Sequence, residues 1–398
     1  MLYTLIGNSS TPFAICQCAW FPWKLHNRTS SSQVASHSRA AAAAAAAANS
    51  FMDSLTELAA VGGENLPAKY IHPDGINGGK DPFLLPFIDI PVIDVGHFTN
   101  PSTDTGKELE KLRAALSSYG CILMGHPLFQ IINHGVESLL LDKVRTVFKQ
   151  FLALPTEQKL ECWTEGFQGY GSDPLVTDVM VHDWSHRLRL ITCPEEMRQM
   201  KYWPENPKNF KEVLHEYSTK LQVLHDVMLK AMAKSLKLDE SVFLRMIGEP
   251  VIMSARFNFY PPCPRPDQVL GLKPHSDGTV ITFLLQDKEV EGLQVLKDGQ
   301  WFRVPVIPDA LVLNAGEHLE IMSNGEFKSP IHRAVVNSER KRISLAAPSI
   351  PHDGNEIEPV EGLVSEERPR LFRKMKYNGR THLRYYQSGR RVVDDARI

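Results

Sequence analysis

The stretch LKPHSDGTVITFLL at 272–285 places a histidine, a serine, an aspartate and a glycine directly before a long apolar run. An apolar run of this length behind a glycine predicts a buried β-strand. His275 and Asp277 are two residues apart, and alternate residues of a strand point to the same face. We therefore expect an imidazole nitrogen and a carboxylate oxygen to be aimed at one point, at the mouth of a buried strand.

A metal ion is held poorly by two ligands, and His332 in SPIHRAVV is the candidate for the third. It lies in a second β-like run, far enough along the chain to be a neighbouring strand of a barrel. Two histidines and one carboxylate form the facial triad of non-haem iron(II) oxygenases, which leaves coordination positions open. The H-x-D pair alone is weak evidence, because such short matches also occur by chance.

Two further pairs of polar residues show the same spacing of two. Arg342 and Ser344 lie in the apolar run RISLAA, and Asn258 and Tyr260 lie in FNFY, upstream of the H-x-D pair. A guanidinium binds a carboxylate through two hydrogen bonds, and a hydroxyl adds another donor. Arg342 and Ser344 therefore predict a site for the distal carboxylate of a dicarboxylic keto acid. The alternative for Arg342 is a surface charge within a basic run.

Helical and strand patterns divide the chain near residue 250. Apolar residues at helical spacing predict helices at 109–116, 141–151 and 210–238, and FQIINHG at 129–135 predicts a short buried strand. From residue 253 onward, short apolar runs alternate with turn residues, and KDGQ at 297–300 predicts a hairpin. We expect an α+β fold in which an antiparallel sandwich or barrel is flanked by helices.

The chain divides into four parts by composition and pattern. They are a low-complexity extension (1–52), a mainly helical region (85–240), a β-rich core (251–355) and a C-terminal helical segment (356–398). The first fifty residues are basic, rich in serine and alanine and free of acidic residues, which is typical of an organelle transit peptide. A disordered tail, or a true start at Met52, would fit as well. We expect a cytoplasmic protein, or a chloroplast protein if the extension is a transit peptide.

The bulk composition argues against two classes of partner. The formal net charge is −2, which gives no reason to expect nucleic-acid binding, and no apolar stretch approaches the ~18 residues of a membrane helix. The six cysteines are scattered without zinc spacing, and a chain this long needs no disulfides for its core, so we expect a reducing compartment. We expect a monomer that binds a small molecule rather than a nucleic acid or a membrane.

The order N-x-Y, H-x-D, H and R-x-S resembles that of the plant-type 2-oxoglutarate- and iron(II)-dependent dioxygenases, the isopenicillin N synthase-like family. The stretches DIPVIDVG, FQIINHGV, PPCPRPDQVLGLKPHSDGT and RYYQSGRRVVDDARI also resemble this family, in its specialised-metabolism branch, from about residue 86 to the end. The resemblance implies a distorted double-stranded β-helix, or jelly roll, with helices packed outside. It also implies iron ligands at His275, Asp277 and His332, and cofactor binding by Tyr260, Arg342, Ser344 and Asn258.

The resemblance implies an enzyme that uses Fe(II), 2-oxoglutarate and O2, with ascorbate as a reductant. The reaction would couple oxidative decarboxylation of 2-oxoglutarate to hydroxylation, demethylation or desaturation of a flavonoid, alkaloid, indole or hormone. We expect the substrate pocket to be lined by the segment 166–190, which is rich in glycine and aromatic residues, and by Phe283 and Leu285. Ordinary core packing is the alternative for these aromatic and aliphatic side chains.

Two features depart from the family pattern. ILMGHPL at 122–128 stands where the family runs straight on, and Pro348 stands where the family commonly has an aromatic residue. A proline removes a donor from a β-ladder, and the loss of a ring would open the pocket. These departures favour one alternative, a catalytically impaired small-molecule-binding protein on the same fold. Another alternative keeps the iron site but uses ascorbate in place of 2-oxoglutarate, as ethylene-forming relatives do.

Overall fold

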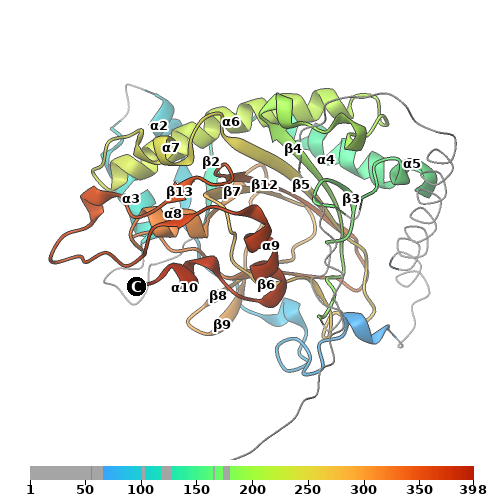
Figure 1. Cartoon of the computed structure of the whole chain (residues 1–398). Helices are drawn as coiled ribbons and strands as arrows, with labels where there is room; N and C mark the ends of the chain where they lie inside the picture. Colours follow the sequence, from blue (N-terminus) through green and yellow to red (C-terminus); the bar gives the residue numbers. More distant parts are fainter. Residues whose placement is uncertain (1–54, 56–65, 101–103, 118–127, 165, 174–179) are drawn as a thin grey trace, which may run out of the picture. The chain divides into compact units, whose positions relative to one another are not determined.

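Two β-sheets form the centre of the protein (Figure 1). The larger sheet has eight strands in the order β1 (Val92–Asp94), β2 (Leu128–Ile132), β10 (Leu311–Ala315), β7 (Ile281–Gln286), β12 (Arg342–Ile350), β5 (Ile252–Tyr260), β4 (His186–Cys193) and β3 (Gly169–Gly171). The smaller has four, in the order β6 (Leu270–His275), β11 (His332–Val335), β8 (Leu293–Lys297) and β9 (Gln300–Arg303). The computed structural model describes residues 55, 66–100, 104–117, 128–164, 166–173 and 180–398.

Three helices cover one face of the larger sheet: α3 (Gly106–Leu116), α4 (Ser138–Leu152) and α6 (Phe210–Ser235) (Figure 1). Their buried side chains share one hydrophobic core with residues from the sheet face beneath them, including Phe257, Phe283 and Leu345. Burial of such a continuous apolar surface is the main favourable contribution to folding. The three predicted helices are thus confirmed, with small shifts at their ends.

Shorter elements complete the chain. The helices are α2 (Gly96–Thr99), α5 (Thr156–Leu160), α7 (Val242–Ile247), α8 (Glu317–Met322), α9 (Gly379–Ser388) and α10 (Val392–Ala396). The 3-10 helices are η1 (Ala68–Tyr70), η2 (Pro82–Leu84), η3 (Glu195–Met197), η4 (Met200–Tyr202) and η5 (Glu361–Leu363). β13 (Glu356–Ile357) and β14 (Met375–Lys376) form a two-stranded sheet near the C-terminus. No helix in the described ranges is both long and apolar enough to cross a bilayer.

The hairpin predicted at 297–300 joins β8 to β9. Its two turn residues, Asp298 and Gly299, have φ values of 50° and 76°. A two-residue turn with both φ values positive is the type I′ geometry, whose twist matches that of the paired strands. The prediction is confirmed.

The larger sheet contains strands from both the predicted helical region and the predicted β-rich core. β1 to β4 come from the region 85–240, yet they pair with β10 and β5 of the core in one continuous sheet. All described residues fall within one compact unit. The extension 1–52 and residues 122–127 of the predicted insertion lie outside the described residues. Leu128 is 1% exposed and begins β2, one residue earlier than predicted.

Candidate active site

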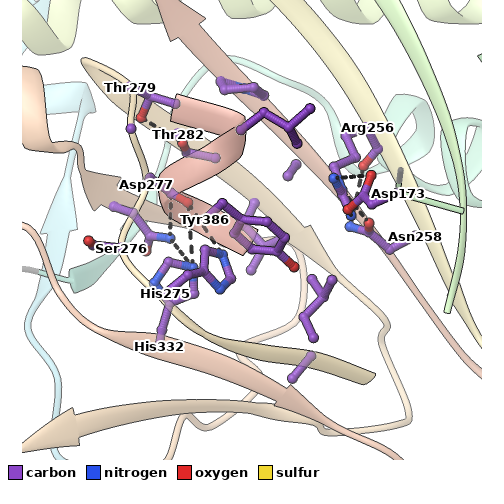
Figure 2. Close-up of a pocket in the computed structure, with 18 of the residues that line it drawn as sticks. Asp173, Arg256, Asn258, His275, Ser276, Asp277, Thr279, Thr282, His332 and Tyr386 are labelled. Carbon is purple, nitrogen blue, oxygen red and sulfur yellow. Dashed lines mark hydrogen bonds and ion pairs between the residues drawn. The ribbon is translucent and has the colours of Figure 1, made fainter. Parts of the chain in front are cut away.

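The three predicted iron ligands come together in one cavity. The Nε2 atom of His275 lies 3.7 Å from Oδ1 of Asp277, and the Nε2 atom of His332 lies 3.6 Å from the same oxygen. One ligand atom from each residue lies within 4.8 Å of the others, and these three residues form the only such cluster of possible metal ligands in the described part of the chain. Figure 2 shows the three side chains turned toward one another.

The backbone brings the ligands together differently from what the sequence predicts. His275 is the last residue of β6, and it pairs directly with His332, the first residue of β11. Asp277 does not belong to a strand. It lies in the connection 276–280, which leads from β6 in the smaller sheet to β7 in the larger one. The expectation that one strand face carries both His275 and Asp277 is therefore wrong, although the two side chains do converge.

Backbone carbonyls fix the orientation of both imidazole rings. Nδ1 of His275 lies 2.8 Å from the carbonyl oxygen of Lys273, and Nδ1 of His332 lies 3.2 Å from that of Pro330. A carbonyl only accepts, so each Nδ1 carries the hydrogen and each Nε2 keeps a lone pair for a metal. The ring orientation thus suits metal binding through Nε2.

The protonation states also suit a metal site. Burial and the neighbouring His332 lower the pKa of His275 to about 3, so its ring is neutral at physiological pH. Burial raises the pKa of Asp277, but His332 and His275 outweigh that effect and lower it overall. Neutral imidazole and ionised carboxylate are the forms that bind metal ions.

The predicted keto-acid pair lies in register on two neighbouring strands. Arg342 on β12 is opposite Tyr260 on β5, and Ser344 is opposite Asn258. All four side chains line the cavity that contains the metal ligands. Nε of Arg342 is buried without a hydrogen-bond partner, and no described carboxylate forms an ion pair with this guanidinium. Such an unpaired buried cation suits an incoming carboxylate, because burying an unpaired charge is costly.

Two glycines leave room for the side chains of Arg342 and Tyr260. A Cβ atom at Gly292 would lie 2.8 Å from Cδ of Arg342, and a Cβ atom at Gly271 would lie 2.6 Å from the ring of Tyr260. Either contact would displace the side chain. Asn258 lines the same cavity, where its amide donates to Oγ of Ser344 at 3.3 Å and its carbonyl accepts from Nε of Arg256 at 2.8 Å. It connects Ser344 to the neighbouring arginine.

The cavity has a volume of about 190 Å³ and is lined by residues of both sheets and of the C-terminal segment. On β7 and β12, Thr282, Leu284 and Ala346 line it. Phe283 and Leu285 were expected to do so, and this is wrong: they are 0% and 1% exposed and pack into the core beneath the helices. In β7 the side chains that face the cavity are those of Thr282 and Leu284, which alternate with Phe283 and Leu285.

Pro348 lies on the cavity wall, as its predicted effect on the pocket requires. It pairs with Thr282 of β7, whereas pairing of β12 with β5 stops at Ala346 and resumes at Ser349. The missing amide hydrogen of proline accounts for a gap in a ladder at such a position. Pro348 therefore interrupts the pairing of β12 with β5, while the cavity that it lines is retained.

Several cavity residues were not singled out from the sequence. Within the predicted lining segment 166–190, Phe167, Asp173, Arg187 and Arg189 line the cavity, while residues 174–179 lie outside the described residues. Arg187 and Arg189 alternate with the buried Leu188 and Leu190 in β4, so their common face was readable from the period of two. Figure 2 shows Asp173 and Arg256 across the pocket from the metal ligands, with Tyr386 of α9 between them in this view.

The C-terminal segment borders the cavity near His275. The Tyr386 ring stands edge-on to the His275 ring at 5.0 Å between centroids, and its hydroxyl donates to Asp183 at 2.8 Å. Asp183 also accepts from the backbone amide of Lys273, two residues before His275. The position of α9 is thereby tied to the strand that carries His275, one of the predicted metal ligands.

Comparisons with known proteins agree with this geometry. Residues 251–349 match the 2OG-Fe(II) oxygenase superfamily, and residues 90–206 match the N-terminal region of non-haem dioxygenase in morphine synthesis. Codeine O-demethylase of Papaver somniferum is 38% identical over 291 residues, covering 72% of this chain and 79% of the relative. Oxoglutarate-dependent flavonoid 7-O-demethylase 1 of Ocimum basilicum is 34% identical over 352 residues, covering 88% and 90%.

A solved structure shows the same fold. The crystal structure of JOX2 in complex with 2OG, Fe, and JA aligns with a TM-score of 0.76 and 32% identity, over 86% of this chain and 97% of that one. The predicted α+β jelly roll flanked by helices is therefore confirmed, and so are Fe(II), 2-oxoglutarate and O2 as its cofactors and co-substrates. The family matches cover more than half of the chain, and its relatives align along most of their length. The protein belongs to the 2-oxoglutarate- and iron(II)-dependent oxygenase superfamily.

Proposed function

We propose that His275, Asp277 and His332 hold the catalytic Fe(II), and that Arg342, Ser344 and Tyr260 hold the distal carboxylate of 2-oxoglutarate. The enzyme couples oxidative decarboxylation of 2-oxoglutarate to oxidation of a small plant metabolite, as its dioxygenase and demethylase relatives do. The observation that carries the assignment is one cavity in which three metal-ligand side chains converge and a buried guanidinium lacks a carboxylate partner.

Each group has a definite task in this assignment. Bound iron supplies the activation of dioxygen, which no side chain of the chain can perform. The Nε2 atoms of His275 and His332 and the Asp277 carboxylate would hold the metal, and a set of three protein ligands leaves coordination positions available for co-substrates. Arg342 fixes the far end of the keto acid by a charge-assisted pair, and the hydroxyls of Ser344 and Tyr260 orient it. Asn258 acts through Ser344 as a positioning residue.

The substrate class follows from the relatives and the cavity. The relatives include demethylases of an alkaloid and of a flavonoid, and JOX2 was crystallised with JA. We propose hydroxylation, demethylation or desaturation of a small molecule whose apolar body contacts Leu284, Leu293 and Ala346. Ascorbate as reductant, a monomeric state and a cytoplasmic location, with the chloroplast as the alternative, complete the proposal.

An assay of succinate formation tests the iron and keto-acid sites. We expect wild-type protein supplied with Fe(II), 2-oxoglutarate, ascorbate and O2 to form succinate, and His275→Ala to form none because a metal ligand is lost. Arg342→Leu should raise KM for 2-oxoglutarate about 10- to 100-fold, the range for losing a charge-assisted hydrogen bond. Arg340→Gln is the matched control, since Arg340 is 51% exposed and pairs with the exposed Glu289.

The competing functions give different results in the same assay. A catalytically impaired binding protein would bind 2-oxoglutarate without forming succinate under any condition. An enzyme that uses ascorbate alone would turn over when 2-oxoglutarate is omitted. Normal turnover by His275→Ala would contradict the assignment of the iron ligands.

A further inference from the structure

Cationic side chains dominate the cavity wall formed by β4 and β5. Arg189 on β4 is directly opposite Arg256 on β5, and Arg187 lies two residues before Arg189 on the same strand face. All three line the cavity, and Asp173 is the one carboxylate with which members of this group form ion pairs in the described chain. Three guanidinium groups therefore share a single negative charge.

Two of these arginines are fully engaged by the protein. Arg187 donates from Nε to Asp173 at 2.7 Å, from Nη1 to the carbonyl of Gly169 at 2.9 Å and from Nη2 to that of Gly166 at 2.7 Å. Arg256 donates to both oxygens of Asp173, at 3.1 and 2.7 Å, and to Asn258. The hydrogen bonds of Arg187 and Arg256 stabilise the cavity wall, so neither guanidinium has a free edge with which to bind a ligand.

Arg189 is different. It forms no hydrogen bond or ion pair with any described residue, and its Nε atom is buried without a partner. Its guanidinium carbon lies 3.5 Å from the ring centroid of Phe167, so its flat face is stacked on an aromatic ring. Stacking occupies the face and leaves the hydrogen-bonding edge available, which is the arrangement that binds planar anions through two parallel bonds.

The charges around Arg189 also favour the binding of an anion there. Burial, and then the neighbouring Arg256 and Arg187, lower the pKa of Arg189 to about 9. The cation is thus penalised where it lies, and an anion beside it would relieve the penalty. The remaining cavity arginines are accounted for: Arg333 donates to Gln294 and Asn77, Arg390 pairs with Asp395, and Arg342 is assigned to 2-oxoglutarate.

We infer that the organic substrate is a carboxylic acid and that Arg189, stacked on Phe167, binds its carboxylate. This inference rests on the proposed function, because it assigns 2-oxoglutarate to Arg342 and thereby leaves Arg189 for the substrate. The carbon skeleton would lie against apolar residues that line the same cavity, among them Leu284, Leu293 and Ala346.

The wall favours a carboxylate over a neutral metabolite for a physical reason. A neutral ligand would cover Arg189 and remove it from water without giving it a partner, which costs free energy. A carboxylate exchanges that cost for a charge-assisted, bidentate pair. The site is therefore expected to discriminate between an acid and its ester, which differ in charge and little in shape.

Binding of matched acid and ester pairs tests the inference. The probes are 4-coumarate, indole-3-acetate and dodecanoate, each with its methyl ester, titrated calorimetrically into protein loaded with Mn(II) and 2-oxoglutarate so that no turnover occurs. We expect at least one acid to bind about 10- to 100-fold more tightly than its ester. Arg189→Gln should abolish that preference by weakening acid binding, with the ester's affinity changed less than about twofold. Arg370→Gln should keep it, because neither Arg370 nor its partner Glu358 lines the cavity.

The outcomes separate the two proposals. Wild-type protein that fails to bind 2-oxoglutarate would contradict the proposed function. Wild-type protein that binds 2-oxoglutarate but no acid, or that binds every ester as tightly as its acid, would overturn the inference alone, as would an acid preference that survives Arg189→Gln. The rise in melting temperature on adding Mn(II) and 2-oxoglutarate shows whether the variant is folded. If Arg189→Gln does not fold, Arg189→Met replaces it, because methionine also removes the charge, and the comparison of acids with esters on wild-type protein remains a test in its own right.

Discussion

At the scale of single residues, Asn314 connects two of the proposed iron ligands. It is 2% exposed on β10, its amide donates to Oδ2 of Asp277 at 3.2 Å, and the same nitrogen lies 3.5 Å from Nε2 of His332. Mutation of residues that hold metal ligands in place typically lowers metal affinity about 10- to 100-fold. Asn314 is a positioning residue because it acts through Asp277.

We expect Asn314→Ala to weaken metal binding roughly tenfold, since Asp277 loses the donor that orients its second oxygen. Calorimetric titration of the apoprotein with Mn(II) measures the change in metal affinity. Asn133→Ala is the control, because Asn133 bonds to Asp94 away from the cavity. Equal affinity in wild type and Asn314→Ala would show that Asp277 needs no such support.

His186 makes stability depend on pH. It is 2% exposed, its Nε2 has no partner, and burial together with Lys159 lowers its pKa from 6.5 to about 4. The unfolded chain binds a proton near pH 6.5 and the folded chain does not, so its contribution to stability is complete above pH 6.5 and lost as pH falls toward 4. Between pH 7.5 and pH 5 this amounts to about 2 kcal/mol.

Urea unfolding at these two pH values, for wild type and His186→Gln, checks this expectation. The variant should lose about 2 kcal/mol less than wild type on acidification, because glutamine does not titrate. His215→Gln, at a 53% exposed side chain, should follow wild type. Identical pH dependence in all three proteins would show that His186 is not the group responsible.

At the scale of elements, sequence reasoning succeeded where the pattern alternates and failed where it does not. Arg342 and Ser344 stand out because polar residues interrupt an apolar run with a period of two. In β7 all six residues are buried on both faces, so nothing in the letters shows whether Phe283 or Leu284 faces the cavity. Asp277 was predicted to be a ligand, and its side chain does converge with the two histidines. The end of β6 before it could not be predicted from propensity, because sheet pairing decides it.

The C-terminal helix α10 and the residue before it support the metal site from behind. Arg391 donates to Oγ of Ser276 at 3.0 Å and to the buried Glu320 at 3.2 Å, and the amide of Val393 donates to Glu317 at 3.0 Å. Ser276 lies between His275 and Asp277 and donates to Glu317. The tail therefore braces the connection that carries a ligand.

We expect Arg391→Met to lower the free energy of unfolding by about 1–3 kcal/mol, because the 1% exposed Glu320 loses a charged partner. Mn(II) affinity should fall as well, since Ser276 loses its donor. Arg397→Met is the matched control: Arg397 lies 3.6 Å from the same carboxylate, but its side chain is 52% exposed, so the change should be below about 1 kcal/mol. Urea unfolding and Mn(II) titration of both variants distinguish a local brace from a general charge effect.

At the scale of the whole molecule, the helical region and the β-core are one structural unit. β4 covers the edge of β5, β2 covers the edge of β10, and α4 and α6 bury the outer face of the same sheet. Without them, two strand edges and a large apolar face would be open to solvent. The four-part division drawn from the sequence therefore describes composition, while the sheet integrates its parts.

A fragment of residues 251–398 should fail to fold, although it contains every proposed iron and 2-oxoglutarate ligand. We expect it to be insoluble, or to lack cooperative thermal unfolding by circular dichroism. The chain from Met52 to the C-terminus is the control, and it should bind Mn(II) and 2-oxoglutarate like the full chain, because all described cavity residues lie at or beyond Phe167. A soluble, cooperatively folding 251–398 fragment would contradict the shared-sheet interpretation.

The position of Asp277 between the two sheets has a consequence for the lifetime of the protein. The proposed ligands come from β6, from β11 and from the connection that crosses to β7, so a bound ion would fasten one sheet to the other. Binding that favours the folded state suppresses opening and shields the backbone from proteases. We expect iron-starved cells to degrade this enzyme faster than iron-replete cells, which would match its abundance to the supply of the metal it needs.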